Sequence, residues 1–403
     1  MNYTKQEVMQ FISEEDVTFI RLAFCDVFGR QKNIAIMPEE INRAFEYGIA
    51  IDASAVTGFG DEGHSDLFLH PDPSTLAALP WRPEHGMVVR MYCSLTYPDG
   101  SQFECDTRHI LKKAIEDAKA AGYEFYFGSE MEFYLFKTND YGENIKIPYD
   151  NASYMDIAPY DKSENIRHDI CLTLKDMGIY PESCHHEEGP GQNEIDFRYS
   201  DALSAADNSL TFRKVVQDIA IQNGLWASFS PKPFDDKPGN GFHINMSIKS
   251  RSGEELATKP MIAGILDKVK DMTIFFNHTD ESFQRLGSHK APRFISWSSG
   301  NRSQLIRIPA AQGEYKRMEL RSPDPRANPY LAFALLIYAA LDGIKNNLSL
   351  MPPSDINFYR ADEETLSKFD MLPQSKEEAA KTAAESQFIK KHIPEPIIKT
   401  YCG

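Results

Sequence analysis

The chain has 403 residues, of which 42% are hydrophobic and 25% are charged, a composition typical of a folded globular protein. The formal net charge is −16, from 59 acidic and 43 basic residues. Because this negative field repels phosphate backbones and anionic lipid headgroups, the charge argues against nucleic acid and membranes as partners. The length exceeds what one hydrophobic core usually supports, so two domains are expected.

The cysteines and the apolar runs bear on the location of the protein. Six cysteines without a CxxC pair predict reduced thiols in a cytoplasmic protein. The opening residues, MNYTKQEVMQFISEEDV, contain no apolar signal segment. The longest apolar run, residues 330–344, is shorter than a membrane span and contains Asp342, so it predicts a buried helix.

The first hundred residues predict a small sheet domain. Apolar, β-branched runs separated by Gly, Pro and Asp turns indicate strands at 17–27, 33–37 and 87–95. A helix is expected from about Thr107, because apolar residues recur at helical spacing until Gly122. We therefore predict two domains, residues 1–101 and residues 102–403.

The second domain alternates helices with short strands, which favours an α+β fold. The segment rich in charged residues, 360–392, predicts surface helices. The other predicted helices lie near 161–177, 201–223, 254–277 and 326–346.

Four of the predicted strands carry polar groups on one face only, because side chains two residues apart point to the same side of a strand. An exposed amphipathic sheet would show the same alternation, but here bulky and aromatic neighbours indicate that the other face is buried. The sets sharing a face are Glu130 with Glu132, Glu194 with Asp196, His243 with Asn245 and Ser247, and Arg317 with Glu319 and Arg321. Clustered carboxylates repel one another unless cations neutralise them, and oxygen-rich sites with an occasional histidine suit Mg²⁺ or Mn²⁺.

Five arginines fall within 37 residues of the second domain: Arg285, Arg302, Arg307, Arg317 and Arg321. Guanidinium groups match the oxygens of carboxylates and phosphates, so arginines beside metal ions favour phosphoryl transfer. The sequence contains no GxxxxGK[ST] loop, GxSxG elbow or HExxH helix. Other nucleotide-binding and hydrolytic classes that depend on those motifs are therefore excluded.

Five sequence blocks, in order, resemble the glutamine synthetase family, its bacterial type I in particular. They are GSEMEFYLF, HHEEGPGQNEID, GNGFHIN, NRSQLIRIP and RMELRSPDPRANPYLAFA, and IDASAVTGF with SDLFLHPD resembles the N-terminal loop that reaches into a neighbouring subunit's site. The resemblance extends to about residue 346. It implies a small N-terminal β-grasp-like sheet domain, followed by a larger catalytic domain with a curved antiparallel sheet flanked by helices.

The resemblance implies an ATP-dependent ligase that forms glutamine from glutamate and ammonium through γ-glutamyl phosphate. It also implies two or three Mg²⁺ or Mn²⁺ ions per site and a homo-oligomeric ring whose sites are shared between subunits. The implied metal ligands are Glu132, Glu187 and Glu194 near glutamate, and Glu130, His243 and Glu319 near the phosphates of ATP.

The same resemblance assigns the substrate-binding residues. Glutamate would be bound by Gly239, Arg285 and Arg321. ATP would be bound by Arg302 and Arg307 at its phosphates, Arg302 also being catalytic, and by Glu182, Asn245, Ser247 and Arg317 along the nucleotide. Asp52 from the neighbouring subunit would bind or deprotonate the incoming ammonium. Asp196 matches no family ligand, and His185 and His186 are expected to orient their loop.

Three features depart from the family pattern. The flap, usually PGxEAP, is GSHKAP here, so Lys290 stands where a catalytic carboxylate is expected. Reversing that charge turns attraction for ammonium into repulsion, which is compatible with Lys290 acting as a base, with another amine or with weak activity. Pro238 replaces the usual asparagine beside Gly239, which can reshape the amino-acid pocket. The resemblance does not include the final segment that ties two rings together in bacterial members.

Two alternatives follow from these departures. One is a γ-glutamyl ligase for a primary amine or a polyamine, which Lys290 favours weakly. The other is a non-catalytic relative that serves assembly or regulation. The second is disfavoured because all six implied metal ligands are present together, and buried acids without a cation are costly.

Overall fold

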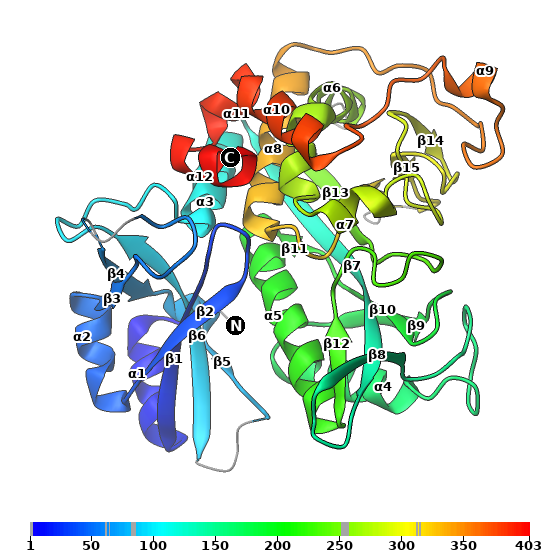
Figure 1. Ribbon diagram of the computed structural model, residues 1–403. Coiled ribbons are helices and arrows are strands. Elements are labelled where there is room, and N and C mark those ends of the chain that lie inside the picture. Colours follow the sequence, from blue (N-terminus) through cyan, green and yellow to red (C-terminus); the bar gives the residue numbers. More distant parts are fainter. Residues whose placement is uncertain are drawn as a thin grey trace.

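The computed structural model describes residues 3–60, 63, 65–81, 86–250, 258–311, 313 and 316–403. It confirms the α+β prediction: a small N-terminal sheet lies beside a larger sheet covered by helices (Figure 1). Within these residues, no helix is both long enough and apolar enough to cross a membrane.

The described part of the N-terminal sheet has six strands in the order β2-β1-β6-β4-β3, with β5 paired to β6. The β1–β6 pair is parallel and the other pairs are antiparallel. The predicted strands at 17–27, 33–37 and 87–95 are confirmed as β1, β2 and β6. The strand bounds are β1 Val17–Cys25, β2 Gln31–Ile36, β3 Ile49–Asp52, β4 Asp66–Pro71, β5 Ala77–Ala78 and β6 Met87–Thr96.

Two helices in this region were not predicted, α1 (Lys5–Glu14) and α2 (Ile41–Glu46). Thr4 begins α1 with a capping box to Glu7, which satisfies backbone amides that the first turn leaves unpaired. Short 3₁₀ segments at Pro38–Glu40 and Pro73–Thr75 complete the connections. The expectation of a strand-rich first hundred residues was therefore incomplete.

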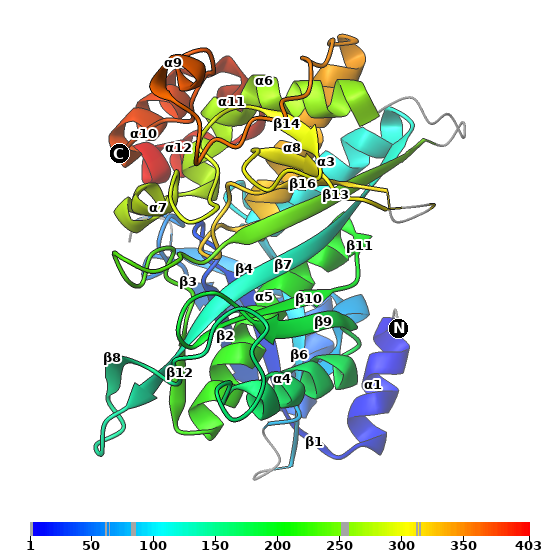
Figure 2. The same ribbon diagram turned by 90° about the vertical axis from the view of Figure 1, so that its right-hand side faces the viewer.

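The larger sheet has ten strands among the described residues, in the order β14-β15-β16-β13-β7-β10-β9, with β8, β11 and β12 also paired to β7. It is antiparallel except for the β14–β15 pair. Figure 2 shows the long strands β7 and β13 running obliquely across the molecule. The bounds are β7 Tyr123–Thr138, β8 Asn144–Pro148, β9 Pro181–His186, β10 Gln192–Phe197, β11 Ser200–Asp201, β12 Leu225–Ser228, β13 Phe242–Ser250, β14 Trp297–Ser299, β15 Ile306–Ile308 and β16 Met318–Leu320.

Helices bury the apolar face of this sheet. The apolar run in α8 forms a buried helix, as predicted, and Phe333 stacks on Phe127 of β7 with ring centroids 4.2 Å apart. Asn328 caps this helix and Pro329 occupies its first turn, so it begins later than residue 326. The bounds are α3 Thr107–Ala120, α4 Glu164–Asp176, α5 Ala202–Gln222, α6 Thr258–Phe276, α7 Asp280–Arg285 and α8 Pro329–Lys345.

The C-terminal segment, from residue 360 onward, is more buried than its content of charged residues suggested. It contains α9 Glu363–Leu366, α10 Lys376–Glu385, α11 Gln387–His392 and α12 Glu395–Cys402. One face of α10 and α11 is buried, with Ala379 and Ile389 fully covered. Tyr401 of α12 packs on Phe28 and Phe275, each at 4.7 Å between ring centroids, and so links the chain end to the β1–β2 turn and to α6.

Candidate active site

Strand register brings the predicted polar groups to one face of the large sheet. Glu194 of β10 lies opposite Glu132 of β7, and Asp196 lies opposite Glu130. On the other side of β7, His243 of β13 lies opposite Glu130. Asn245 of β13 in turn lies opposite Glu319 of β16. Antiparallel pairing therefore converts spacing along four strands into one cluster of side chains.

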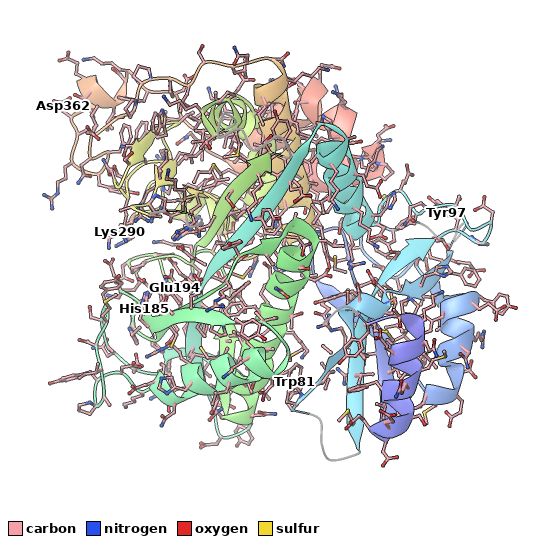
Figure 3. All side chains as sticks on the ribbon, turned by 180° about the vertical axis from the view of Figure 1, so that it is seen from behind. Trp81, Tyr97, His185, Glu194, Lys290 and Asp362 are labelled. Carbon is pink, nitrogen blue, oxygen red and sulfur yellow. The ribbon has the colours of Figure 1, made fainter. Side chains whose placement is uncertain are left out.

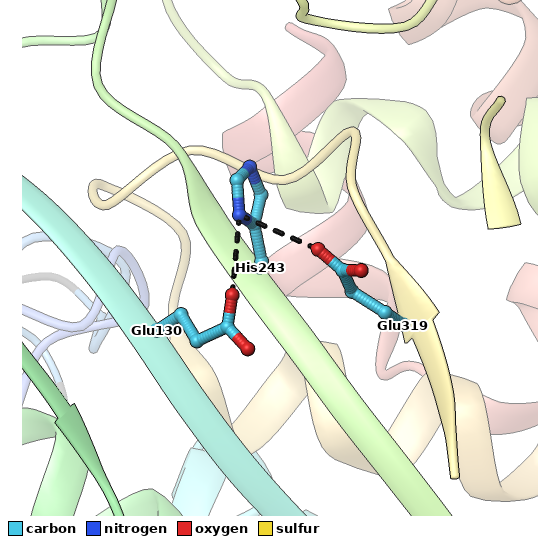
Figure 4. Close-up of side chains that lie close together, drawn as sticks. All are labelled: Glu130, His243 and Glu319. Carbon is cyan, nitrogen blue, oxygen red and sulfur yellow. Dashed lines mark ion pairs between the residues drawn. The ribbon is translucent and has the colours of Figure 1, made fainter. Parts of the chain in front are cut away.

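Glu130, His243 and Glu319 form the first ligand group. The Nδ1 atom of His243 lies 3.6 Å from a carboxylate oxygen of Glu130 and 3.6 Å from one of Glu319 (Figure 4). Their ligand atoms all lie within 4.8 Å of one another. Two carboxylates and one imidazole held on strands form a donor set of the kind that binds Mg²⁺ or Mn²⁺.

The second predicted ligand group is Glu132, Glu187 and Glu194. In the structure, its members fall into two sets of neighbouring side chains that share Glu194. Glu194 groups with Glu132 and His243 on one side and with Glu187 and His185 on the other, each set spanning less than 4.8 Å. The Nε2 atom of His185 lies 3.2 Å from Glu194. His185 therefore offers a ligand atom, beyond the loop-orienting role expected for it.

The pKa values show how strongly these carboxylates are crowded. Burial and the charge of Glu132 raise the pKa of Glu187 to about 8. Burial and the charge of Asp196 raise the pKa of Glu194 well above its usual value. The pKa of Glu130 moves the other way: burial raises it, but the hydrogen bond and charge of His243 outweigh burial and lower it to about 2. A set of acids that repel one another is the donor arrangement that divalent cations neutralise.

We expect removal of divalent cations to make stability fall as pH rises. The raised pKa values, about 8 for Glu187 and about 7 for Asp196, mean that the folded protein holds these protons more tightly than the unfolded chain. This contribution is complete below the unfolded values and is lost as pH rises through the folded ones. Melting temperature after chelation should fall by at least a few degrees between pH 5 and pH 9. Excess Mg²⁺ should flatten the fall, and equal slopes with and without Mg²⁺ would contradict the metal assignment.

The loop between β9 and β10, which carries Glu187, is held in place by a buried polar network. His186 contacts the Glu187 carbonyl oxygen through Nδ1 at 2.6 Å and Asp150 through Nε2 at 2.9 Å. Arg167 bonds to both Asp161 and Asn193. His186 thus orients the loop, as expected from the sequence.

Gln192 and Asn240 connect this loop to the predicted amino-acid pocket. The Gln192 amide donates to Glu132 at 3.2 Å, to the Gly239 carbonyl at 3.1 Å and to Asn240 at 3.2 Å. A Cβ atom on Gly239 would lie 2.3 Å from the Pro231 carbonyl oxygen, so only glycine fits there. The resemblance did not assign Gln192, although its position within GPGQNE was a signal.

A cavity of about 120 Å³ is lined by the acidic groups and by four of the predicted arginines. These are Arg285, Arg302, Arg307 and Arg321. Buried Arg285 donates to the Ser322 carbonyl at 2.8 Å, and Arg307 pairs with Glu319 at 2.7 Å. Such a mixture of acids and guanidinium groups can bind metal ions and anionic substrates together.

A neighbouring cavity of about 320 Å³ brings together the other residues predicted for ATP. Glu182, Asn245, Ser247 and Arg317 all line it. Asn245 donates to Glu130 at 2.7 Å and accepts from Arg317 at 2.7 Å. Glu130 lines both cavities, so the first ligand group lies at their junction.

Lys290 lines the smaller cavity together with Glu194. Figure 3 labels it on the same side of the molecule as Glu194 and His185. Its ammonium group forms an ion pair with Glu188 and lies 5.7 Å from the ring centroid of Tyr154. The carbonyl oxygen of Lys290 accepts a hydrogen bond from Arg321 at 3.2 Å. The flap is therefore tied to the acidic loop and to the arginine cluster, and sequence reasoning missed Glu188 and Tyr154 as partners.

Asp52 is placed apart from both cavities of its own chain. It ends β3, is exposed, and accepts hydrogen bonds from the backbone and hydroxyl of Ser54 at 3.0 and 2.6 Å. These bonds lower its pKa, so the carboxylate is charged at neutral pH.

Comparisons with known proteins agree with this geometry. A family model described as "Glutamine synthetase, catalytic domain" matches residues 104–403, and one described as "Glutamine synthetase, beta-Grasp domain" matches residues 16–98. A glutamine synthetase of Clostridium saccharobutylicum is 41% identical, covering 99% of this chain and 93% of the relative. One of Methanosarcina mazei is 40% identical, with 99% and 92% covered. The chain belongs to the glutamine synthetase family.

Solved structures show the same fold. A structure titled "GmaS/ADP complex-Conformation 1" has a TM-score of 0.88 at 27% identity, covering 98% of this chain and 94% of the other. A Plasmodium falciparum glutamine synthetase has a TM-score of 0.87 at 22% identity, covering 100% and 95%. The predicted β-grasp-like domain followed by a curved sheet with flanking helices is thus confirmed.

Proposed function

We infer that the protein is an ATP-dependent ligase that forms glutamine from glutamate and ammonium through γ-glutamyl phosphate. The observation that carries this function is the junction of the two cavities at Glu130, which sets a nucleotide-sized cavity beside a small arginine-lined one. The relatives named above are glutamine synthetases, and this chain matches them over nearly their full length. That similarity does not favour an amine ligase or a non-catalytic role.

We propose that the two cavities divide the substrates. Arg285 and Arg321 hold the carboxylates of glutamate in the smaller cavity, with Gly239 letting the amino acid approach the backbone. Arg302 and Arg307 face the phosphates of ATP. Glu182, Asn245, Ser247 and Arg317 bind the rest of the nucleotide in the larger cavity.

We propose that the metal ions are Mg²⁺ or Mn²⁺. The ion nearest ATP is held by Glu130, His243 and Glu319, and the ion nearest glutamate by Glu132, Glu187 and Glu194. The chemistry that bound ions supply is neutralisation of charge on the transferring phosphoryl group. The raised pKa values of Glu187 and Glu194 support this placement, because those acids have no cation among the described residues that neutralises them fully.

The proposed reaction has two steps, phosphoryl transfer to glutamate and then displacement of the phosphate by ammonia. A side-chain oxygen of glutamate forms a bond to the γ-phosphorus of ATP while the bond to ADP breaks. Ammonia next bonds to the carbonyl carbon, and phosphate leaves with the glutamate oxygen. We propose that Asp52 of a neighbouring subunit binds ammonium and takes its proton, which requires a homo-oligomer such as a ring.

Lys290 acts in this proposal through its ion pair with Glu188. The pair neutralises the charge reversal in the flap, so ammonium does not meet an uncompensated cation. Glu188→Ala should lower kcat/KM for ammonium by about tenfold because it leaves the Lys290 cation uncompensated, whereas Lys290→Ala and the double variant, which lack that cation, should lose less. Lys399→Ala, which breaks an exposed pair with Glu395, serves as the matched control. Additive losses would show that the two residues act separately.

We also propose that the chain divides at residues 101 and 102, between β6 and α3. The enzyme is proposed to work in the cytoplasm, where ATP is available and where its six free thiols stay reduced.

The test of this function is release of phosphate and formation of glutamine from ATP, glutamate and Mg²⁺ or Mn²⁺. Ammonium should support turnover, and a panel of primary amines and polyamines should support little. Turnover with amines alone would instead make the protein a γ-glutamyl amine ligase. No turnover from folded, metal-loaded protein would reject the ligase function.

A further inference from the structure

A third large cavity, of about 420 Å³, lies between the N-terminal sheet and the catalytic domain. The turn between β1 and β2 meets α5 there, as Figure 1 shows. Segment 226–230, which begins within β12, His278 and loop 325–326 also line it. None of its lining residues belongs to the active site described above.

The lining is strongly basic in a chain whose net charge is −16. No acidic side chain is among its described lining residues. Four cationic side chains line the cavity: Arg30, Arg213, Lys214 and Arg326. Because like charges repel, their convergence at one cavity has an electrostatic cost unless an anion offsets it.

Among the described residues, only two of these four cations form ion pairs within 4.0 Å, while Asp26 and Asp324 act on Arg213 from a longer distance. Lys214 pairs with Asp218 at 2.5 Å, and Arg326 approaches Glu281 at 3.7 Å. Neither Arg30 nor Arg213 has a carboxylate oxygen within 4.0 Å in the described part of the chain. Arg213 donates instead to neutral carbonyl oxygens, including those of Pro325 at 2.9 Å and Gly29 at 3.1 Å.

The lowered pKa of His278, which lines the cavity, reflects the positive potential there. Burial lowers its pKa, and the charges of Arg326, Arg30 and other cations lower it further, to about 3. Its ring stacks on Phe28 at 5.0 Å between centroids, and its buried Nδ1 atom has no hydrogen-bond partner among the described residues. The cavity thus offers a flat aromatic wall and an unused polar atom beside its cations.

We propose that this cavity binds a small organic anion with two or more negative charges, carried by phosphoryl or carboxylate groups. Arg30 and Arg326 enter it from opposite domains, so one polyanion contacts both. Guanidinium groups bind either anion type through paired hydrogen bonds. The volume of about 420 Å³ exceeds that of the glutamate cavity and accommodates a metabolite-sized ligand.

Two wall segments connect this anion site to the glutamate cavity. The carbonyl oxygens of Ser228 and Ser230 accept hydrogen bonds from Asn240, which also accepts from Gln192. Loop 325–326 follows Arg321 and Ser322, whose carbonyl oxygens bind Arg285. An anion that draws the domains together therefore shifts groups that position Gly239 and Arg321, which couples the anion site to glutamate affinity.

The test is calorimetric titration of the full-length enzyme with Mg²⁺, saturating ADP and glutamate, which occupy the active site. Glycerol 2-phosphate is the phosphoryl probe and tricarballylate the carboxylate probe. At least one should bind, and binding should weaken at least tenfold in Arg30→Gln/Arg326→Gln. Arg43→Gln, which removes an exposed arginine that pairs with Glu40 on the surface of α2, should leave binding unchanged.

Three results would overturn the proposal. They are no binding of either probe at millimolar concentration, equal binding by the double variant and the control, and probe binding that appears only when ADP and glutamate are left out. Melting curves of the double variant exclude a folding defect, since Arg30 is exposed and Arg326 is partly so. The KM for glutamate should shift at least twofold with the probe in wild type alone. An unchanged KM would reject the coupling.

Discussion

Glu319→Gln is expected to lower kcat/KM by a factor on the order of 10³. Glu319 is only 2% exposed, pairs with Arg307 at 2.7 Å and Arg321 at 3.1 Å, and faces His243 at 3.6 Å. The amide keeps the shape of the side chain but removes the charge that two guanidinium groups share and that we propose also binds a divalent cation. Removing one partner of a buried ion pair also typically lowers the free energy of unfolding by about 3–5 kcal/mol.

Steady-state kinetics across a Mg²⁺ titration would check this expectation. The variant should need far more Mg²⁺ for half-maximal activity, whereas Glu385→Gln, an exposed change on α10, should behave as wild type. Melting curves would separate loss of fold from loss of metal affinity. An unchanged Mg²⁺ requirement in folded Glu319→Gln would remove Glu319 from the metal group.

Arg321→Lys is expected to raise the KM for glutamate and lower kcat, together reducing kcat/KM by about 10²-fold. Arg321 is 4% exposed and joins three parts of the site. It donates to Glu319 at 3.1 Å, to the flap carbonyl of Lys290 at 3.2 Å and to the carbonyl of Arg302. Lysine keeps the charge, but a single ammonium cannot make these contacts in a fixed plane.

The readout for Arg321→Lys is the separate change of kcat and of the KM for glutamate and ATP. We expect the KM for ATP to change least, because Arg321 does not line the nucleotide cavity. Arg43→Lys on the surface of α2 is the control. A wild-type KM for glutamate would show that the cluster does not bind that substrate.

The residues that share a strand face were predictable from sequence because side-chain alternation is a local property of a strand, whereas the roles of residues such as Glu187 and Asp52 came only from the family resemblance. Alternation at Glu130 and Glu132 fixed which side chains share a face, and the flanking Phe and Met residues showed which face is buried. What alternation could not supply was register. That Glu194 lies opposite Glu132, and His243 opposite Glu130, depends on strand pairing across more than fifty residues.

The remaining errors have physical causes of their own. The charge of segment 360–392 concealed the buried faces of α10 and α11, because a helix needs only a narrow apolar stripe to dock. Helix α12 was missed because the eight residues Glu395–Cys402 give little periodicity, although Tyr401 is 2% exposed. The Lys290–Glu188 pair joins residues 102 positions apart, and charge alone did not identify the partner.

The most direct test of the central claim uses glutamate labelled with oxygen-18 in its side-chain carboxylate. If the protein forms γ-glutamyl phosphate, each turnover with ATP and ammonium transfers one labelled oxygen to the released phosphate. Mass spectrometry of the phosphate should therefore show a single label, matched by glutamine that retains the other labelled oxygen. Phosphate released without label would mean that ATP is hydrolysed by water, and would contradict phosphoryl transfer to glutamate at this site.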